Sequence, residues 1–362
     1  NTTSWSIDNV SVKEVIENNV PRIDYTLGCG KLLLEGQRTN SLLQSNTFNT
    51  AWINQLGGGT ITGGQINALS ESDDAWKLTK DAASGRSIRQ AISLSSSTYA
   101  YSAFLKSGTL TNASMRVDTS SGARFMNLDL SIGTISSTSG TIVSTSIEDY
   151  GNGWYRCTMV VSESITNVHV YVGEFSGTTA GNIYCQRTQL EQGSYSTSYI
   201  PTSGTAVTRV ADTPSKTAAT ALIGQTQGTI FFDSFFDDLD TVNFSVSDGT
   251  SSNYILIDTS GGAVVFARVQ QGGVTQAQIN TAPAFYTAGT RLKCAIAYNS
   301  NDIAFYINGT LVGIDTSATI PACNQIRFAR WNGVVAAAQR VQAAMLFPTR
   351  LSNAELATLT TI

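Results

Sequence analysis

The stretch DIAFYINGTLVGI, residues 302–314, carries the clearest fold signal in the sequence. Two largely apolar runs flank the dipeptide Asn308-Gly309. This dipeptide favours the two-residue turn of a β-hairpin, because the turn needs residues that accept a positive φ. The stretch therefore predicts two antiparallel strands joined by a tight turn.

Short segments of the same kind occupy most of the sequence after residue 75. Many alternate apolar and polar residues, as half-buried antiparallel strands do, and turns rich in Gly, Ser, Asn or Asp separate them. Only LSNAELATL, residues 351–359, has a helical pattern, with Ser352 as the N-cap and Glu355 three residues later. The sequence predicts an all-β fold of tandem β-sandwiches with one short C-terminal helix.

Composition excludes several classes of partner. Charged residues make up 13% of the chain, about half the roughly 25% usual for soluble domains. The net charge is −4 without a basic stripe, which argues against nucleic acid as a partner. No apolar run approaches the roughly 20 residues of a membrane span, so we expect no membrane insertion. Five widely spaced cysteines without a CxxC pair predict free thiols and folding in a reducing cytoplasm.

The boundary between the two sandwiches is expected in residues 198–220, which carry Pro201 and Pro214 and lack apolar periodicity. The first residues have the pattern of a bulged strand, so we expect the chain to begin inside a longer protein. The predicted segments are an upstream end strand with a lead-in (1–40), a jelly roll (41–205), a linker (206–215) and a second sandwich (216–362).

Two stretches near the start resemble a pattern of bacteriophage tail and other virion structural proteins. They are PRIDY, residues 21–25, and GCGKLLLEGQRTNSLLQSNTFNTAW, residues 28–52. In those proteins this pattern leads into a jelly roll similar to carbohydrate-binding modules. The resemblance continues through EDYGNGWYRCTM (148–159) and QLEQGSYSTSYIPTSGTAVTRVAD (189–212).

The last part of the chain resembles laminin-G or concanavalin A-like lectin sandwiches. The residues that carry this likeness are AFYINGTLVG (304–313) and AAMLFPTRLSNAELATL (343–359). The resemblance implies a jelly roll followed by a concanavalin A-like sandwich.

Together the resemblance and the residues imply a non-enzymatic module of a phage tail fibre or similar virion appendage, assembled in the host cytoplasm. Its implied partners are a host cell-surface glycan and other virion proteins, and we expect a homo-oligomer, with a trimer favoured. Two alternatives stay open. The chain is a purely structural assembly or decoration module of a virion, or it holds accessory carbohydrate-binding domains of a secreted polysaccharide-degrading enzyme.

The run KLLLEGQRTNSLL, residues 31–43, is interpreted as a structural joint rather than a catalytic loop. The leucines before Glu35 are expected to enter a buried sheet, leaving Glu35 and Arg38 to pair with each other or to bond backbone groups at the corner. Thr39 and Asn40 suit a turn that redirects the chain.

Catalytic motifs are scarce in the sequence. His169 alternates along the expected strand NVHVYVG and is interpreted as a residue of a sheet face or core rather than a general base. The acidic run around residues 233–240 suits solvated loop carboxylates. Three of its members, Asp237, Asp238 and Asp240, are also weak candidates for a structural Ca²⁺ site.

Aromatic residues offer more specific candidates, because sugar rings stack their C–H faces on aromatic side chains beside polar turn residues. Trp331 ends the apolar run RFARW and precedes Asn332-Gly333, a turn-forming pair. We therefore expect a glycan site on the C-terminal sandwich with Trp331 and Asn332 at its edge. Tyr254 and Tyr306 are weaker candidates for the same site. The other expectation for Trp331 is that it packs beneath the C-terminal helix.

Overall fold

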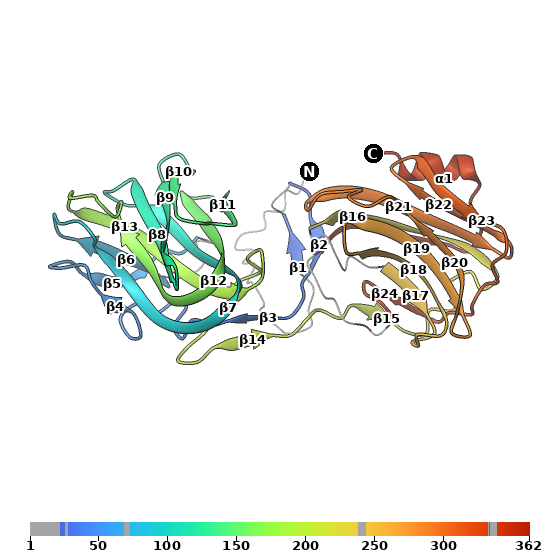
Figure 1. Cartoon of the computed structure of the whole chain (residues 1–362), viewed down its shortest axis with the longest axis horizontal. Helices are drawn as coiled ribbons and strands as arrows, with labels where there is room; N and C mark the ends of the chain where they lie inside the picture. Colours follow the sequence, from blue (N-terminus) through green and yellow to red (C-terminus); the bar gives the residue numbers. More distant parts are fainter. Residues whose placement is uncertain (1–21, 26–27, 69–72, 238–243, 332, 334–338) are drawn as a thin grey trace, which may run out of the picture. The chain divides into compact units, whose positions relative to one another are not determined.

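The computed structural model describes residues 22–25, 28–68, 73–237, 244–331, 333 and 339–362. These residues divide into two compact units (Figure 1). We call Arg38–Arg209 sandwich 1, and we call residues 22–37 together with Val210–Ile362 sandwich 2. Tandem all-β sandwiches with a short C-terminal helix, the fold class predicted from the sequence, are confirmed.

Sandwich 1 contains a ten-stranded antiparallel sheet in the described part of the chain, with the order β10-β9-β8-β12-β7-β13-β6-β5. β11 pairs with β12 and β4 with β7, and β3 and β14 form a separate pair. The strands of sandwich 1 are β3 (Arg38–Asn40), β4 (Ile53–Asn54), β5 (Ile61–Gln65), β6 (Ala75–Lys80), β7 (Ser87–Ser107), β8 (Asn112–Thr119), β9 (Gly122–Asp129), β10 (Thr134–Ser139), β11 (Ser144–Asp149), β12 (Trp154–Val172), β13 (Gly181–Gln192) and β14 (Val207–Arg209).

The two long strands β7 and β12 explain how one sheet encloses a core. β7 and β12 pair with each other along nearly their whole lengths, the second half of β7 also pairs with β13, and the end of β12 also pairs with β8. Register shifts between Glu163 and Asn167 interrupt the β12 ladders, and such bulges let a strand bend. The apolar side chains of both halves meet in one buried cluster that includes Tyr101, Met115 and Val170.

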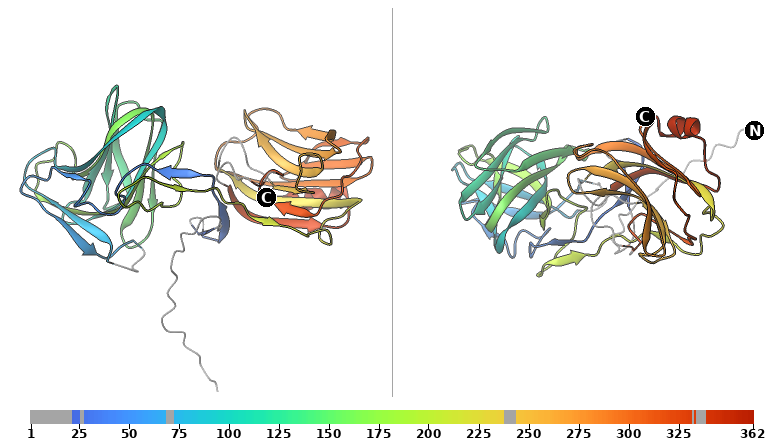
Figure 2. Two further views of the ribbon diagram at one scale, coloured as in Figure 1. Left: turned by 90° about the horizontal axis from the view of Figure 1, so that it is seen from below. Right: turned by 45° about the vertical axis from the view of Figure 1, so that its right-hand side comes forward.

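Sandwich 2 has two facing antiparallel sheets (Figure 2). One sheet has the order β1-β2-β25-β16-β21-β22-β23 and the other the order β15-β24-β17-β18-β19-β20. The strands of sandwich 2 are β1 (Arg22–Asp24), β2 (Lys31–Leu34), β15 (Ser215–Lys216), β16 (Gln227–Phe236), β17 (Phe244–Ser247), β18 (Tyr254–Ser260), β19 (Val264–Gln271), β20 (Val274–Asn280), β21 (Thr290–Asn299), β22 (Asp302–Ile307), β23 (Thr310–Asp315), β24 (Gln325–Arg327) and β25 (Gln339–Phe347).

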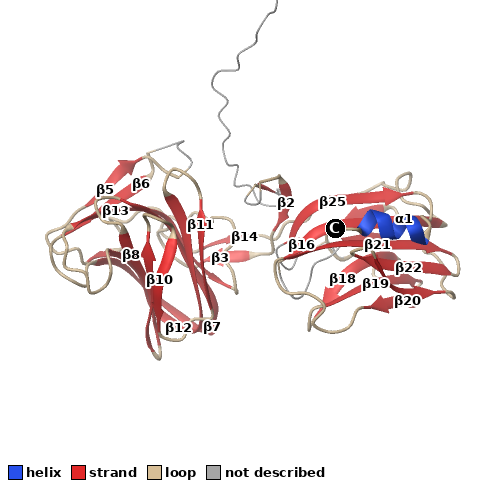
Figure 3. Ribbon diagram, turned by 90° about the horizontal axis from the view of Figure 1, so that it is seen from above, coloured by secondary structure: helices blue, strands red, loops and turns tan. Residues whose placement is uncertain are grey.

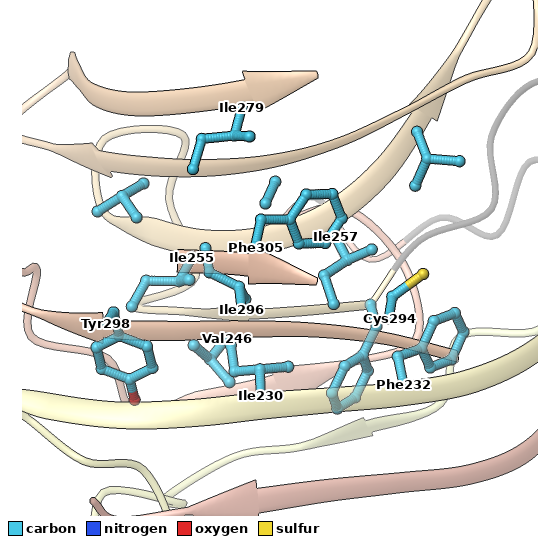
Figure 4. Close-up of a cluster of buried hydrophobic side chains, with 14 of the residues drawn as sticks. Ile230, Phe232, Val246, Ile255, Ile257, Ile279, Cys294, Ile296, Tyr298 and Phe305 are labelled. Atoms are coloured by element: carbon cyan, nitrogen blue, oxygen red, sulfur yellow. The ribbon is translucent and has the colours of Figure 1, made fainter. Parts of the chain in front are cut away.

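The core of sandwich 2 lies between these sheets. Figure 4 shows Ile230, Phe232 and Ile296 of the seven-stranded sheet together with Ile255 and Ile257 of the six-stranded sheet. Each of these side chains is at most 1% exposed. Burial of this kind stabilises a fold by about 25 cal/mol for each Å² of apolar surface removed from water.

The opening hairpin and the terminal helix form as predicted. Asn308 (φ 49°) and Gly309 (φ 79°) connect β22 to β23. The helix α1 (Asn353–Thr360) starts with the predicted capping box, in which the Ser352 hydroxyl accepts from Glu355 N and the Glu355 carboxylate accepts from Ser352 N. Figure 3 shows α1 against the sheet of β21 and β22.

The structure divides the chain differently from the expected segments. Residues 31–34, assigned to a lead-in, form β2, which pairs with β25 some 300 residues later and so completes a sheet of sandwich 2. The expected linker 206–215 holds β14, and its Asp212 is buried. Asp212 exchanges hydrogen bonds with Glu35, whose backbone N–H donates to the Asp212 carboxylate over 2.9 Å. The expected upstream end strand lies outside the described residues.

The expected joint is built from two separate anchors. In sandwich 2 the buried Glu35 carboxylate accepts a hydrogen bond from Arg22 over 2.8 Å. In sandwich 1 the Asn40 side-chain amide, fully buried, donates to Ile200 O and accepts from the backbone N–H of Leu190. Each anchor ties the run to its own unit.

Candidate functional site

The candidate site lies on the outer face of the six-stranded sheet of sandwich 2. In β18, Ile255 and Ile257 point into the core, so the alternate residues Tyr254, Leu256 and Asp258 lie on the opposite face. On that face they are buried. Burial on the outer side of a sheet means that other groups cover them.

Register places polar and aromatic residues of β19 and β20 beside them. Asp258 pairs with Phe266. Arg268, two residues after Phe266, pairs with Gln278. Directly opposed residues in antiparallel strands bring their side chains within contact distance. The outer face therefore presents a row of aromatic and charged groups across three strands.

Trp331 covers part of this face. The segment that follows β24 is held by the Ser245 hydroxyl, which donates to Ala329 O over 2.7 Å. Two residues later the Trp331 ring stacks on Tyr254, with ring centroids 4.5 Å apart and planes 13° apart. Trp331 also packs against Leu256 and Phe266. One face of the indole is thus fixed by the sheet.

Beside Trp331 lies a cavity of about 250 Å³. Typical small-molecule sites have roughly 300–1,000 Å³, so this cavity suits a ligand group no larger than a single ring. The cavity is lined by Asp258, Ser260, Val264, Phe266, Arg268, Gln278, Asn280, Arg330 and Trp331.

An ion pair between a partly exposed arginine and a buried aspartate lies in the wall of the cavity. Arg330 Nε donates to Asp258 Oδ2 over 2.7 Å, and the Asp258 side chain is only 2% exposed. Burial raises the pKa of Asp258 to about 6, although the hydrogen bond and charge of Arg330 act to lower it. Near neutral pH this carboxylate is ionised, yet its proton affinity is far higher than that of an exposed aspartate.

Arg268 forms the second cationic group of the wall. Its Nε donates to Gln278 Oε1 over 2.7 Å, and its guanidinium lies 5.0 Å from the Phe266 ring centroid. The aromatic ring and the amide hold the guanidinium plane in place. The site therefore combines an aromatic platform with two positioned cations and two exposed amides, Gln278 and Asn280.

The structure brings together only part of the predicted glycan site. Trp331 borders the cavity, whereas Tyr254 is buried, does not line the cavity, and stacks on the indole. Tyr306 is on β22 of the opposite sheet, buried in a cluster with Leu356 of α1. It is Tyr306, and not Trp331, that packs beneath the helix. Asn332 lies outside the described residues.

The metal candidates are not assembled into a site in the described residues. Asp237 has both carboxylate oxygens bound by Arg340, over 2.6 and 2.8 Å. Asp238 and Asp240 lie outside the described residues. Among those that are described, no group of three or more His, Cys, Asp or Glu side chains is close enough to hold a metal. Likewise, no described helix has the length and apolar character of a membrane span.

Sandwich 1 contains a second cluster that the sequence did not predict. His169 Nε2 lies 3.0 Å from Asp118 Oδ2, and its Nδ1 lies 3.4 Å from the hydroxyl of Ser87. Burial lowers the pKa of His169 to about 4, so the imidazole is neutral at pH 7. These are the three residue types of a serine hydrolase triad, but the ring nitrogens are exchanged, because in a triad Nε2 faces the serine and Nδ1 faces the aspartate. Ser87, however, is fully buried and its hydroxyl donates to Gln55 Oε1 over 3.2 Å, so no substrate can reach this hydroxyl.

Sequence reasoning missed most of the cavity wall. Asp258, Phe266, Arg268 and Arg330 were not proposed as ligand contacts. One signal could have found three of them: positions 254, 256 and 258 alternate with core positions, and so do 266 and 268. The position of Arg330 beside Asp258 depends on how the chain crosses the sheet after β24.

Neither a family model nor a curated relative matches the chain. Among solved structures, the chain is similar to the CBM40 of the Ruminococcus gnavus IT-sialidase, at 16% identity over 38% of this chain and 85% of that one, with a TM-score of 0.33. It is similar to the NanB sialidase from Streptococcus pneumoniae at 16% identity, over 41% of this chain and 27% of that one, with a TM-score of 0.35. Sheep galectin-11 is similar at 5% identity, over 38% of this chain and 99% of that one, with a TM-score of 0.27. Similarities at this level do not assign a function.

Proposed function

We propose that the protein is a non-enzymatic carbohydrate-binding module whose glycan site is the cavity beside Trp331. The observation that supports this function is the combination of one indole with positioned arginines and exposed amides in the wall of a ring-sized cavity. An aromatic side chain provides a surface for the C–H face of a sugar ring. Guanidinium and amide groups supply the hydrogen bonds that hydroxyl groups require.

The preorganisation of Trp331 favours binding. Its ring is already stacked on Tyr254, so a ligand does not have to pay for fixing a mobile side chain. Ordering a flexible side chain at an interface costs about 0.5–1.5 kcal/mol. A sugar that enters the cavity therefore meets a rigid aromatic edge beside polar groups.

Replacement of Trp331 by alanine tests the function. In binding assays on an array of bacterial surface polysaccharides, Trp331→Ala is expected to weaken binding by about 5- to 150-fold, the range for loss of an aromatic hot spot of roughly 1–3 kcal/mol. Trp331→Phe keeps an aromatic ring and should retain part of the affinity. The matched control is Phe175→Ala, which removes a half-exposed aromatic ring of sandwich 1 and should leave binding unchanged.

Thermal unfolding of the same variants separates binding from packing. We expect Trp331→Ala to lower the melting temperature only modestly, because Trp331 is only partly buried. A sharp drop in melting temperature, or unchanged binding, would show that Trp331 serves to cover the sheet and that the glycan site is elsewhere or absent.

The setting we propose is a virion surface, in a phage tail fibre or similar appendage built as a trimer that also contacts other virion proteins. The motifs of residues 21–25 and 28–52 support it. The genes next to its coding sequence test this setting. Tail-assembly genes would support it, whereas genes for polysaccharide degradation would favour an accessory module of a secreted enzyme.

A further inference from the structure

The cavity beside Trp331 has a charge opposite in sign to that of the whole chain. The protein carries a net charge of −4, yet among the residues that the structure describes, the charged ones that line the cavity are Arg268, Arg330 and Asp258. With Asp258 ionised, this lining has one net positive charge. A site for a neutral sugar does not require this net positive charge.

The two arginines also keep hydrogen-bond donors available. Within the described residues, Arg330 bonds the chain through Nε only, and Arg268 through Nε and Nη1. The remaining guanidinium nitrogens are exposed to solvent in the described part of the chain. They are Nη1 and Nη2 of Arg330 and Nη2 of Arg268. Guanidinium nitrogens in a fixed plane match the two oxygens of a carboxylate.

A single anion can therefore satisfy both the charge and the donors. Asp258 neutralises one arginine and is itself held by Arg330 and by the backbone N–H of Thr259. A carboxylate of the ligand would neutralise the second positive charge, which is that of Arg268. The aromatic edge of Trp331 would meanwhile contact the ring that bears this carboxylate.

We propose that the site selects acidic sugars, binding a pyranose carboxylate at Arg268 and Arg330 while the ring lies against Trp331. This inference rests on the proposed function and names the ligand class of the same site. Selection follows from the two arginines, because a neutral sugar that covered them would displace water and leave part of their charge uncompensated.

The test compares each acidic glycan with its own carboxyl-reduced form, which has the same backbone without the charge. The probes are immobilised sialyllactose, hyaluronan, alginate and polygalacturonate, each beside its reduced counterpart, and the unmodified protein is applied to all of them. At least one acidic probe is expected to bind ten-fold or more tightly than its reduced form, with the difference shrinking as salt is added.

Three variants assign the effect to the cavity. Arg268→Gln should weaken binding of the preferred acidic probe about ten-fold, and Arg268→Lys should restore part of it. We choose Arg268 because its removal does not strand the buried Asp258 carboxylate. Lys216→Gln is the matched control: it removes one positive charge from β15 of the same sheet, at an exposed position outside the cavity, and should have no effect.

The outcomes separate the two proposals. Equal binding of acidic and reduced probes, or equal effects of Arg268→Gln and Lys216→Gln, would overturn the choice of acidic sugars. If binding is confined to neutral glycans and depends on Trp331, the inference fails and the proposed function stands. If no probe binds in a way that depends on Trp331, both fail.

Discussion

The outer sheet faces of the two sandwiches carry similar residues in different states. In sandwich 1, Asp118 accepts from Arg116 over 2.5 Å and contacts His169 over 3.0 Å. In sandwich 2, Asp258 accepts from Arg330 beside a cavity. Burial acts to raise the pKa of both carboxyl groups. The partners of Asp118 outweigh it and lower that pKa, whereas the pKa of Asp258 rises to about 6.

The difference shows how a polar cluster can be complete or incomplete. The cluster of sandwich 1 is closed over by aromatic contacts, since His169 stacks on Tyr171 and Arg116 lies over Phe125. Its ionised carboxylate has two partners of its own. In sandwich 2 the pKa of the Asp258 carboxyl group is raised, and the arginine N–H donors line a cavity. An incomplete cluster of this kind is where a ligand can gain free energy.

The largest expected effect is a difference in the free energy of unfolding at pH 7.5 between variants of the two aspartates. A lowered native pKa means that ionised Asp118 stabilises the fold above its ordinary pKa near 4, and this stability is lost as the pH falls. Asp118→Asn should therefore lower the free energy of unfolding of sandwich 1 by about 2–3 kcal/mol. A raised native pKa has the opposite sign, so ionised Asp258 costs stability at this pH. Asp258→Asn should leave sandwich 2 within about 1 kcal/mol of the parent, or more stable.

Urea denaturation measures the total change, and hydrogen exchange of the amides in β8 and β18 assigns it to a sandwich. The two substitutions are chemically identical, so each serves as the control for the other. Equal losses in both sandwiches would break the comparison, because they would show that the Asp258–Arg330 pair is as favourable as the cluster of Asp118.

Local patterns in the sequence were sufficient for the strands, the hairpin turn and the helix cap, because each depends on neighbouring residues. The Asn308-Gly309 turn and the Ser352 cap are examples. Trp331 was selected as a candidate through its place at the end of an apolar run, and it borders the cavity. Tyr306 was misplaced because its outward face is covered by α1, a tertiary contact that strand alternation cannot reveal.

The charged wall of the cavity depends on pairing between strands. In NYILIDTS both faces of β18 are largely apolar and buried, so alternation places Asp258 on the outward face without showing that a cavity lies there. The pairing of β2 with β25 was missed for a similar reason, since a contact across 300 residues leaves no local signal. The register and order of the strands determine which residues line the cavity, and neither can be predicted from a single segment of the sequence.

A smaller effect concerns the pH dependence of binding, which should belong to sandwich 2 alone. As the pH falls from 7.5 to 5.0, Asp258 gains a proton near pH 6 and releases part of its hold on Arg330. Arg268 also acts on this carboxyl group, so the cavity becomes more positive. The ligand carboxylate stays largely ionised, because ordinary carboxyl groups have pKa values near 4. Affinity for an acidic glycan should rise about three- to ten-fold.

Asp258→Asn should flatten this profile, and binding isotherms at five pH values would measure it. His169 has a pKa of about 4, so it stays neutral in the folded protein across this range and contributes nothing to the profile. A pH dependence that persists in Asp258→Asn would assign the titrating group to another residue. Circular dichroism at pH 5.0 checks that the fold is intact.

The smallest expected effect concerns the thiols, whose reactivity measures the unfolding of each sandwich without a change in its core residues. Cys29 is exposed, whereas sandwich 1 buries Cys157 and Cys185 and sandwich 2 buries Cys294 and Cys323. Burial raises the pKa of all four, that of Cys323 to about 12, and a thiol of this kind is unreactive until its core opens. In the native protein a thiol reagent should label Cys29 rapidly, and Cys29→Ser should remove that fast phase with a stability change below about 0.5 kcal/mol.

In urea the other thiols should become reactive in pairs. Asp118→Asn should lower the urea concentration at which Cys157 and Cys185 react and leave that of the other pair unchanged, as mass spectrometry of the labelled peptides would show. Release of all four in one step would mean that the two cores unfold together, and fewer than five thiols in the unfolded chain would reveal a disulfide.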